Sequence, residues 1–370
     1  MLVGISIVLL AAYVAFVFWM IFHWPKAQVL NKSTNATTTF SVIVPFRNEA
    51  ERLQKTLEAL NEVNYPRDLW DVIFVDDHSE DLGKGLIEAN PASYRRQVLA
   101  SEGEGKKSAL ATGIAASTAS WVVTLDADTV VGPSWLRSIA SGVEANKAAK
   151  VLVLPVYYRR SDKPLHQFFA LEFLSLMGSG LSTANGGRPI MANGANFAFA
   201  RSLYDELGGY GSHAHMSSGD DVLLLLEAHR RDARRVVAWG AAEGAAQTEA
   251  PDSWRQWFAQ RVRWGSKSKA YGTSAAYWVA LLVFLTNFWL IVLGVGVLFL
   301  PSALLPLVVF FVLKLIVDAV FMVRVVSAYN QRHLLVWLPV LALAYPLLLS
   351  LSVLLGLTLP VKWKGRKVSL

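Results

Sequence analysis

The chain of 370 residues contains no cysteine. Disulfide bonds, thiolate metal ligands and cysteine nucleophiles are therefore excluded. Charged residues are also scarce, because they make up 17% of the sequence against 54% for hydrophobic residues. An ordinary soluble domain carries a larger charged fraction. The composition therefore indicates a membrane protein that also has a soluble part.

The excess of positive charge, a formal +7, does not indicate a nucleic-acid partner. The basic residues gather near apolar runs, as they do on the cytoplasmic flanks of membrane spans. No stripe of lysine and arginine is interleaved with aromatic residues, as a nucleic-acid module would require. We therefore expect the membrane, and not nucleic acid, as a partner.

The first apolar run covers residues 1–22 and contains no charged residue. It is long enough to cross a bilayer, and it lacks the basic start and small-residue cleavage site of a signal peptide. We expect a retained transmembrane helix, followed by a polar linker over residues 23–39. Lys26 and Lys32 follow the span and predict that the next domain is cytoplasmic.

A second membrane region is expected over residues 271–360, with two to three segments, and a basic tail over residues 361–370. Lys314 and Asp318 lie one helical turn apart within it and are expected to neutralise each other. The last segment contains two prolines, and one full crossing would place the basic tail outside. We therefore favour a re-entrant hairpin there. The chain is expected to be a multi-pass protein of the inner or plasma membrane.

Residues 40–270 have the texture of a globular domain. Short β-rich runs alternate with helical patterns, which predicts an α/β fold with a mainly parallel sheet. The expected strands include Ser41–Val44, Asp71–Val75, Trp121–Leu125 and Val151–Val156. The apolar stretch Leu165–Leu181, with its lone Glu172, is either a buried core helix or an interfacial helix at the membrane.

Two carboxylates follow the strand Trp121–Leu125, at Asp126 and Asp128. They face the same side if the strand geometry continues to its end. In open α/β sheets, ligands bind beyond the carboxyl ends of strands, and paired carboxylates suit Mg²⁺ or Mn²⁺. A solvated acidic turn is the alternative interpretation of the same pattern.

Several short motifs occur in a fixed order between Phe40 and Ser268. They are Val-Pro-Phe-Arg-Asn-Glu49, Val-Asp-Asp-His-Ser79, Gly-Lys-Lys-Ser-Ala-Leu110, Leu-Asp-Ala-Asp128, Gly-Ala-Asn-Phe-Ala-Phe-Ala-Arg201, Gly-Asp-Asp221 and Gln-Arg-Val-Arg-Trp264. Each is weak alone, but the order resembles that of the membrane-embedded family 2 glycosyltransferases. That family includes cellulose, hyaluronan and poly-N-acetylglucosamine synthases and the ceramide glucosyltransferases.

The resemblance implies a GT-A fold with a donor site at the carboxyl edge of the sheet. It implies that Asp126 and Asp128 hold a divalent metal, Mg²⁺ or Mn²⁺, against the diphosphate of a UDP-sugar. The residues matched to contacts with the nucleotide are Pro45, Glu49, Asp76, Asp77 and Lys106.

The resemblance also implies an acceptor side of the site. Asp221 matches the catalytic base of a Thr-Glu-Asp motif, which stands here as Gly-Asp-Asp, so Asp220 is the alternative base. The loop expected to line the sugar and acceptor pocket contains Asn193, Gly194, Ala195 and Asn196. The residues matched to a Gln-x-x-Arg-Trp motif, for the diphosphate and the acceptor, are Gln260, Arg261, Arg263 and Trp264.

These residues predict a membrane-bound, inverting glycosyltransferase. The donor would be a UDP-sugar of the glucose or N-acetylglucosamine type, and the acceptor a hydroxyl of a membrane lipid or glycolipid. A processive polysaccharide synthase subunit that elongates an exported glycan is the first alternative. A non-catalytic membrane scaffold on a GT-A fold is an alternative of another class.

Overall fold

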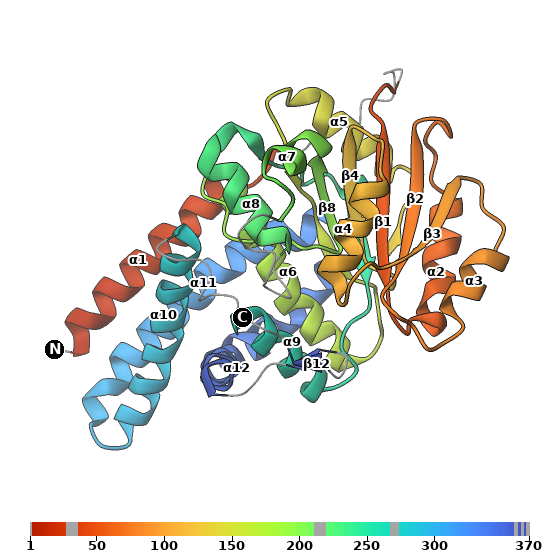
Figure 1. Cartoon of the computed structure of the whole chain (residues 1–370). Helices are drawn as coiled ribbons and strands as arrows, with labels where there is room; N and C mark the ends of the chain where they lie inside the picture. Colours follow the sequence, from red (N-terminus) through yellow and green to blue (C-terminus); the bar gives the residue numbers. More distant parts are fainter. Residues whose placement is uncertain are drawn as a thin grey trace.

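The computed structural model describes residues 2–26, 36–210, 220–266, 274–358, 362–363 and 366–367. A layered α/β domain lies on one side of the molecule, and long helices extend from it on the other (Figure 1). The predicted boundary between residues 270 and 271 lies outside the described residues. The domain boundaries therefore stay predictions.

A seven-stranded sheet with the order β3-β2-β1-β4-β8-β6-β9 forms the centre of the α/β domain. Strands β3, β2, β1 and β4 are parallel, whereas β8 runs antiparallel to both β4 and β6. The sheet is thus mainly parallel, as predicted. The strands are β1 (Phe40–Phe46), β2 (Trp70–Asp76), β3 (Arg95–Ala100), β4 (Trp121–Leu125), β6 (Val151–Val153), β8 (Asn196–Ala200) and β9 (Val236–Ala238).

Alternating side chains on the strands build a core on each face of the sheet. Val42 and Val44 of β1 pack in the core that contains α2, while Ile43 packs in the core that contains α4. The two cores explain why these strands are apolar throughout, as buried parallel strands are. The helices of this domain are α2 (Ala50–Asn61), α3 (Gly83–Ala89), α4 (Lys106–Ala116), α5 (Trp135–Ala145), α7 (Arg201–Glu206) and α8 (Asp220–Arg231).

A second, three-stranded sheet consists of β5 (Val130–Val131), β10 (Ala246–Thr248) and β7 (Val156–Tyr158). The strand predicted over 151–156 is divided, because Pro155 separates β6 in the large sheet from β7 in the small one. Proline removes a backbone donor, so a strand that changes sheet can do so there.

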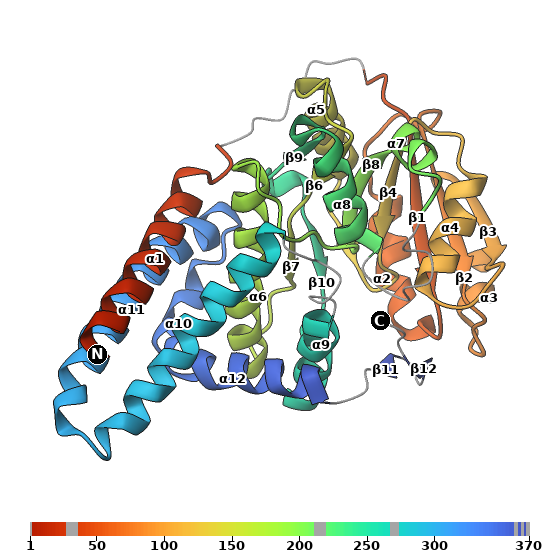
Figure 2. The same ribbon diagram turned by 60° about the vertical axis from the view of Figure 1, so that its left-hand side comes forward.

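Helix α6 (Pro164–Asn185) lies between the sheets and the membrane-side helices (Figure 2). It packs against β7 and β9 on one side and against α11 (Leu304–Ala328) and α1 (Leu2–Phe22) on the other. Phe169, Leu171 and Leu174 are completely or almost completely buried. Of the two alternatives for this stretch, the structure shows the buried core helix.

Within the described ranges, four helices are long and apolar enough to cross a membrane. Three are α1 (Leu2–Phe22), α10 (Ala275–Val297) and α11 (Leu304–Ala328), which run alongside one another (Figure 2). The expected pairing inside α11 is present, since Lys314 Nζ lies 2.6 Å from Asp318 Oδ2. Tyr13 of α1 donates a hydrogen bond of 2.8 Å to the same carboxylate, which ties the two helices together.

The re-entrant hairpin expected in the last apolar segment is wrong, because the structure has a continuous helix there. A short 3₁₀ helix, η6 (Arg332–Trp337), leads into one continuous helix, α12 (Leu338–Thr358), with Pro346 inside it. The chain does not turn back there, and Leu341 before Pro346 and Leu348 after it both pack against the same apolar core. Helix α12 runs across α10 and α11 and reaches α9 (Trp254–Ser266) (Figures 1 and 2). The strands β11 (Lys362–Trp363) and β12 (Arg366–Lys367) pair within the predicted basic tail.

Candidate active site

The loops after β1 and β2 are joined to each other at the carboxyl edge of the sheet. Asn48 Oδ1 accepts a 2.8 Å hydrogen bond from the Glu80 amide, and the Asn48 amide donates to Ser79 Oγ at 3.1 Å. Asn48 and His78 both have positive φ, 52° and 57°, which is uncommon outside glycine. Their shared left-handed geometry shapes the two loops predicted to contact the nucleotide.

The residues predicted to contact the nucleotide on these loops differ in exposure. Pro45 is buried within β1, whereas Glu49 and Asp76 are partly exposed. Asp76 Oδ1 accepts from the Ser79 amide at 2.8 Å. Asp77 is 2% exposed and accepts from the Gly105 amide at 2.8 Å, just before α4. Asp77 therefore orders the start of α4, from which Lys106 extends.

Asp126 and Asp128 lie in a turn and not on a continuing strand. Strand β4 ends at Leu125, and the Thr129 amide donates to the Asp126 carbonyl at 3.1 Å. The strand geometry therefore does not continue to Asp128, as the prediction of like-facing carboxylates required. The two carboxylates nevertheless remain close enough to interact. Burial, followed by the charges of Asp126 and Glu49, raises the pKa of Asp128 to about 6.

Lys106 is the cation that balances this acidic turn. Its Nζ lies 2.5 Å from Asp126 Oδ1, and both side chains are partly exposed. The sequence predicted a contact between Lys106 and the nucleotide. In the structure, the lysine occupies one side of the predicted metal ligand Asp126.

The acidic turn can hold a divalent cation only with help from a substrate. Among the described residues, no group of three or more histidine, aspartate or glutamate side chains converges into a complete metal site. Two carboxylates that repel each other fit Mg²⁺ or Mn²⁺, which often takes one or two protein carboxylates together with substrate phosphates. The residues present therefore fit a metal that binds with a diphosphate.

Asp221 is connected to the acidic turn through strand β4. The buried Asp221 carboxylate accepts a 2.8 Å hydrogen bond from the Gly194 amide through Oδ2. The Gly194 carbonyl accepts at 2.9 Å from Thr124 Oγ1, two residues before Asp126. The predicted base and the predicted metal ligands thus share one hydrogen-bonded scaffold. The side chain of the alternative base, Asp220, lies outside the described part of the chain.

The loop predicted to line the sugar pocket contains residues with different environments. Asn193 Oδ1 accepts from the Ala195 amide at 3.0 Å, which closes a tight turn around Gly194. Asn196 is completely buried, and its amide nitrogen donates at 2.9 Å to the carbonyls of both Pro155 and Gly244. Asn196 therefore anchors the loop to the segments that precede β7 and β10, and these contacts occupy its amide nitrogen.

Helix α9 carries the predicted Gln-x-x-Arg-Trp motif and is fixed by a buried ion pair. Arg261 pairs with Glu172 of α6, and the two residues are 8% and 1% exposed. The guanidinium carbon of Arg261 lies 5.0 Å from the ring centre of Trp257 and 4.4 Å from that of Trp264. Arg261 is thus a packing residue of the motif, while Arg263 and Trp264 are partly exposed.

Two residues that fix α9 had no assigned role in the sequence interpretation. Tyr158 at the end of β7 donates a 3.0 Å hydrogen bond to Gln260 Oε1 and stacks on Phe173 at 4.3 Å. Glu172 is the lone acid in an apolar stretch of the sequence, and a buried acid requires a cationic partner. That rule signals the need for a partner, but the sequence does not show which arginine supplies it.

Comparison with known proteins assigns this domain to a class. Residues 41–208 match the family model described as glycosyl transferase family 2. The probable glycosyltransferase YdaM of Bacillus subtilis is 26% identical over 237 residues, 60% of this chain and 54% of that protein. An undecaprenyl-phosphate 4-deoxy-4-formamido-L-arabinose transferase of Pectobacterium carotovorum is 34% identical over 95 residues, 24% of this chain and 28% of that protein. The chain thus matches about half or less of these curated relatives' length.

The solved structure of the mannosyltransferase PcManGT from Pyrobaculum calidifontis, in complex with GDP-Man and Mn²⁺, has the same fold. Its TM-score is 0.55 at 20% identity, with 96% of this chain and 99% of that chain covered. The comparisons therefore confirm the predicted GT-A fold. The match of residues 41–208 to the family 2 model, together with the glycosyltransferase relatives, confirms the enzyme class predicted from the sequence motifs.

Proposed function

We propose that the chain is an inverting glycosyltransferase that transfers a sugar from a UDP-sugar to a hydroxyl of a membrane lipid or glycolipid. The observation that carries this proposal is the connection from Asp221 through Gly194 to Thr124, beside the acidic turn. This connection holds the proposed base next to the proposed donor site, as transfer of the sugar from the donor to an acceptor hydroxyl requires. A donor of the glucose or N-acetylglucosamine type remains the proposed substrate.

In this proposal, Asp221 accepts the proton of the acceptor hydroxyl while the oxygen attacks the anomeric carbon. The hydrogen bonds to the Gly194 and Val222 amides, both 2.8 Å long, keep the carboxylate in one orientation. A positioned carboxylate is an effective general base. Direct attack from the face opposite the leaving diphosphate inverts the anomeric centre and needs no covalent nucleophile.

Asp126 and Asp128 would hold a divalent cation, whose charge would stabilise the leaving diphosphate. Lys106 neutralises Asp126 in the structure and is placed to contribute positive charge to the same group. The solved mannosyltransferase complex contains Mn²⁺, which is consistent with a divalent metal in the proposed reaction. Either Mg²⁺ or Mn²⁺ suits the two carboxylates.

The lipid acceptor is supported by the four apolar helices next to the domain and by the name of the Pectobacterium relative. The domain is proposed to be cytoplasmic, on the basis of the lysines that follow the first span. A GDP-sugar donor is the second candidate, because the solved structure that covers 96% of this chain contains GDP-Man.

The test is nucleotide release by the purified protein in detergent, with a panel of UDP-sugars and GDP-mannose, with and without Mg²⁺ or Mn²⁺. Membrane lipids would be present in half of the reactions. We expect metal-dependent turnover with one UDP-sugar and a requirement for lipid. Turnover with GDP-mannose alone would show that the donor is a GDP-sugar. Growth of a long glycan would show that the acceptor is a polymer and not a lipid. The absence of both turnover and nucleotide binding would favour the non-catalytic scaffold.

The matched variant is Asp221→Asn, which keeps the shape of the side chain and removes the base. Turnover should fall by a factor of about 10² to 10⁴, the usual contribution of general base catalysis. Binding of the nucleotide should be nearly unchanged, because the base acts on the acceptor. Loss of nucleotide binding in this variant would show that Asp221 belongs to the donor site.

A further inference from the structure

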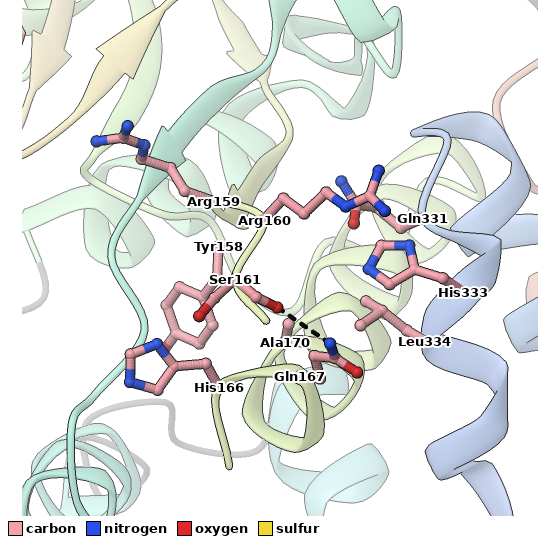
Figure 3. A pocket seen from close by; sticks show the side chains of 10 residues that line it. All are labelled: Tyr158, Arg159, Arg160, Ser161, His166, Gln167, Ala170, Gln331, His333 and Leu334. Carbon is pink, nitrogen blue, oxygen red and sulfur yellow. Dashed lines mark hydrogen bonds between the residues drawn. The ribbon is translucent and has the colours of Figure 1, made fainter. Parts of the chain in front are cut away.

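A small cavity outside the acidic turn is lined by cationic and polar side chains. None of the carboxylates assigned to the donor, metal or base lines it. Figure 3 shows this cavity between the segment that follows β7 and the segment that follows α11. The lining residues that carry charge or hydrogen-bonding groups at its rim include Arg159, Arg160, His166, Gln167, Gln331 and His333.

The positive charge of this cavity is only partly neutralised. Arg159 lies 3.4 Å from Glu249, and His166 lies 3.2 Å from Asp252. Arg160, in contrast, forms no hydrogen bond or ion pair with any other described residue. Its side chain extends toward Gln331 and His333 in Figure 3. The cavity therefore has one exposed guanidinium, flanked by two further side chains that can form hydrogen bonds.

The cavity lies where a membrane helix ends. Helix α11, one of the four candidate spans, ends at Ala328, and Gln331 and His333 follow within five residues. The opposite wall is the start of α6, where Gln167 accepts a 2.9 Å hydrogen bond from Trp337. A lipid headgroup at the end of α11 would thus stand at the level of Arg160. Basic pockets beside membrane helices commonly bind anionic headgroups.

We propose that this cavity binds a phosphate group, with the headgroup of an anionic membrane lipid as its source. Arg160 would bind two phosphate oxygens with its planar guanidinium, as arginine does when it is free to form paired hydrogen bonds. Gln331 and His333 would complete the contacts from the α11 side. This site is separate from the proposed transfer reaction and does not depend on the donor or acceptor of that reaction.

The test is thermal unfolding of the full chain in detergent, titrated with short-chain phosphatidylglycerol, short-chain phosphatidylcholine or inorganic phosphate. We expect a saturable rise in unfolding temperature with phosphatidylglycerol and none with phosphatidylcholine. A rise that inorganic phosphate reproduces alone would assign the site to free phosphate. A rise that requires the acyl chains would assign it to lipid.

The variant Arg160→Ala should weaken this response about fivefold, the effect of one basic side chain near an anionic headgroup. Arg160→Lys should restore part of it, because lysine keeps the charge but not the paired hydrogen bonds. The matched control is Arg332→Ala, since Arg332 is an exposed arginine on the same segment that does not line the cavity. The proposal would be overturned if Arg160→Ala and Arg332→Ala lost the response equally, or if Arg160→Ala left it unchanged. The absence of a response to all three compounds would overturn it as well.

Discussion

The acidic turn and the junction between α6 and α9 place carboxylates in opposite environments. Asp126 and Asp128 lie close together, and only Asp126 has a cation within ion-pair distance among the described residues. Glu172 is instead fully buried and paired with one arginine that is held between two indole rings. The first arrangement leaves negative charge for a ligand to neutralise, whereas the second uses charge to fix the position of a helix.

The acidic turn and the α6–α9 junction can therefore contribute in different ways to one site. A cation can bind at the acidic turn because its charge relieves the repulsion between Asp126 and Asp128. Helix α9 carries Arg263 and Trp264, and the buried ion pair holds it in one position, as the proposed contacts of these two residues with the substrate would require. We therefore expect mutations at the turn to affect ligand binding and turnover, and mutations at the junction to affect stability as well.

The largest expected effect is that of Glu172→Ala. Removal of one partner from a buried ion pair leaves an uncompensated charge, which typically costs about 3–5 kcal/mol. The free energy of unfolding should fall accordingly, as measured by denaturant or thermal unfolding in detergent. The double variant Glu172→Met with Arg261→Met is the control, because apolar replacement of both partners should recover most of the loss. A single variant as stable as the wild type would show that the pair does not fix α9.

The next effect is that of Asp128→Asn, which should lower turnover by a factor of about 10² to 10³, as loss of one electrostatic contact in a transition state does. The metal-free protein should not lose stability, because the substitution removes a partly buried charge and its repulsion with Asp126. Metal titration of nucleotide release checks the first expectation, and thermal unfolding without metal checks the second. Asp68→Asn, at an exposed aspartate before β2, is the control. Unchanged metal dependence would contradict the role of Asp128.

Sequence patterns predicted the parallel strands well, because buried strands leave continuous apolar runs such as Val42–Val44 and Val72–Val75. They also placed Asp126 and Asp77 at the carboxyl edge, which follows from strand order alone. The pairing of Glu172 with Arg261 and of Asp221 with Gly194 was not predictable. These contacts join residues 89 and 27 positions apart, and only the packed fold determines them.

The course of α12 was mispredicted for a similar reason. A sequence rule on the sidedness of basic residues favoured a hairpin, but the helix continues through Pro346 and packs against α9 and α10. Contacts with α9 and α10 stabilise the helix although proline removes one backbone donor. The local signal of the proline was therefore weaker than the packing that surrounds it.

A smaller effect is expected for Lys106→Met, which should strengthen metal binding and weaken nucleotide binding. Loss of the amine beside Asp126 removes a competing cation, so the metal alone should bind about twofold to fivefold more tightly, the range expected for a partly exposed pair worth up to about 1 kcal/mol. Nucleotide binding should weaken, because the phosphate groups lose a positive neighbour. Calorimetric titration with Mn²⁺ and with UDP separates the two. Weaker binding of both would mean that Lys106 only holds Asp126 in place.

The smallest expected effect is that of Tyr158→Phe. The ring still stacks on Phe173, and only the hydrogen bond to Gln260 is lost, which should cost about 1 kcal/mol of stability. If this bond orients α9, turnover should fall more than nucleotide binding, measured as kcat against KM for the donor. The neighbouring variant Tyr157→Phe is the matched control, since its hydroxyl accepts from Gln247 within the second sheet and does not contact α9. Equal kinetic effects of both substitutions would show that the junction stabilises the fold without setting the orientation of the motif.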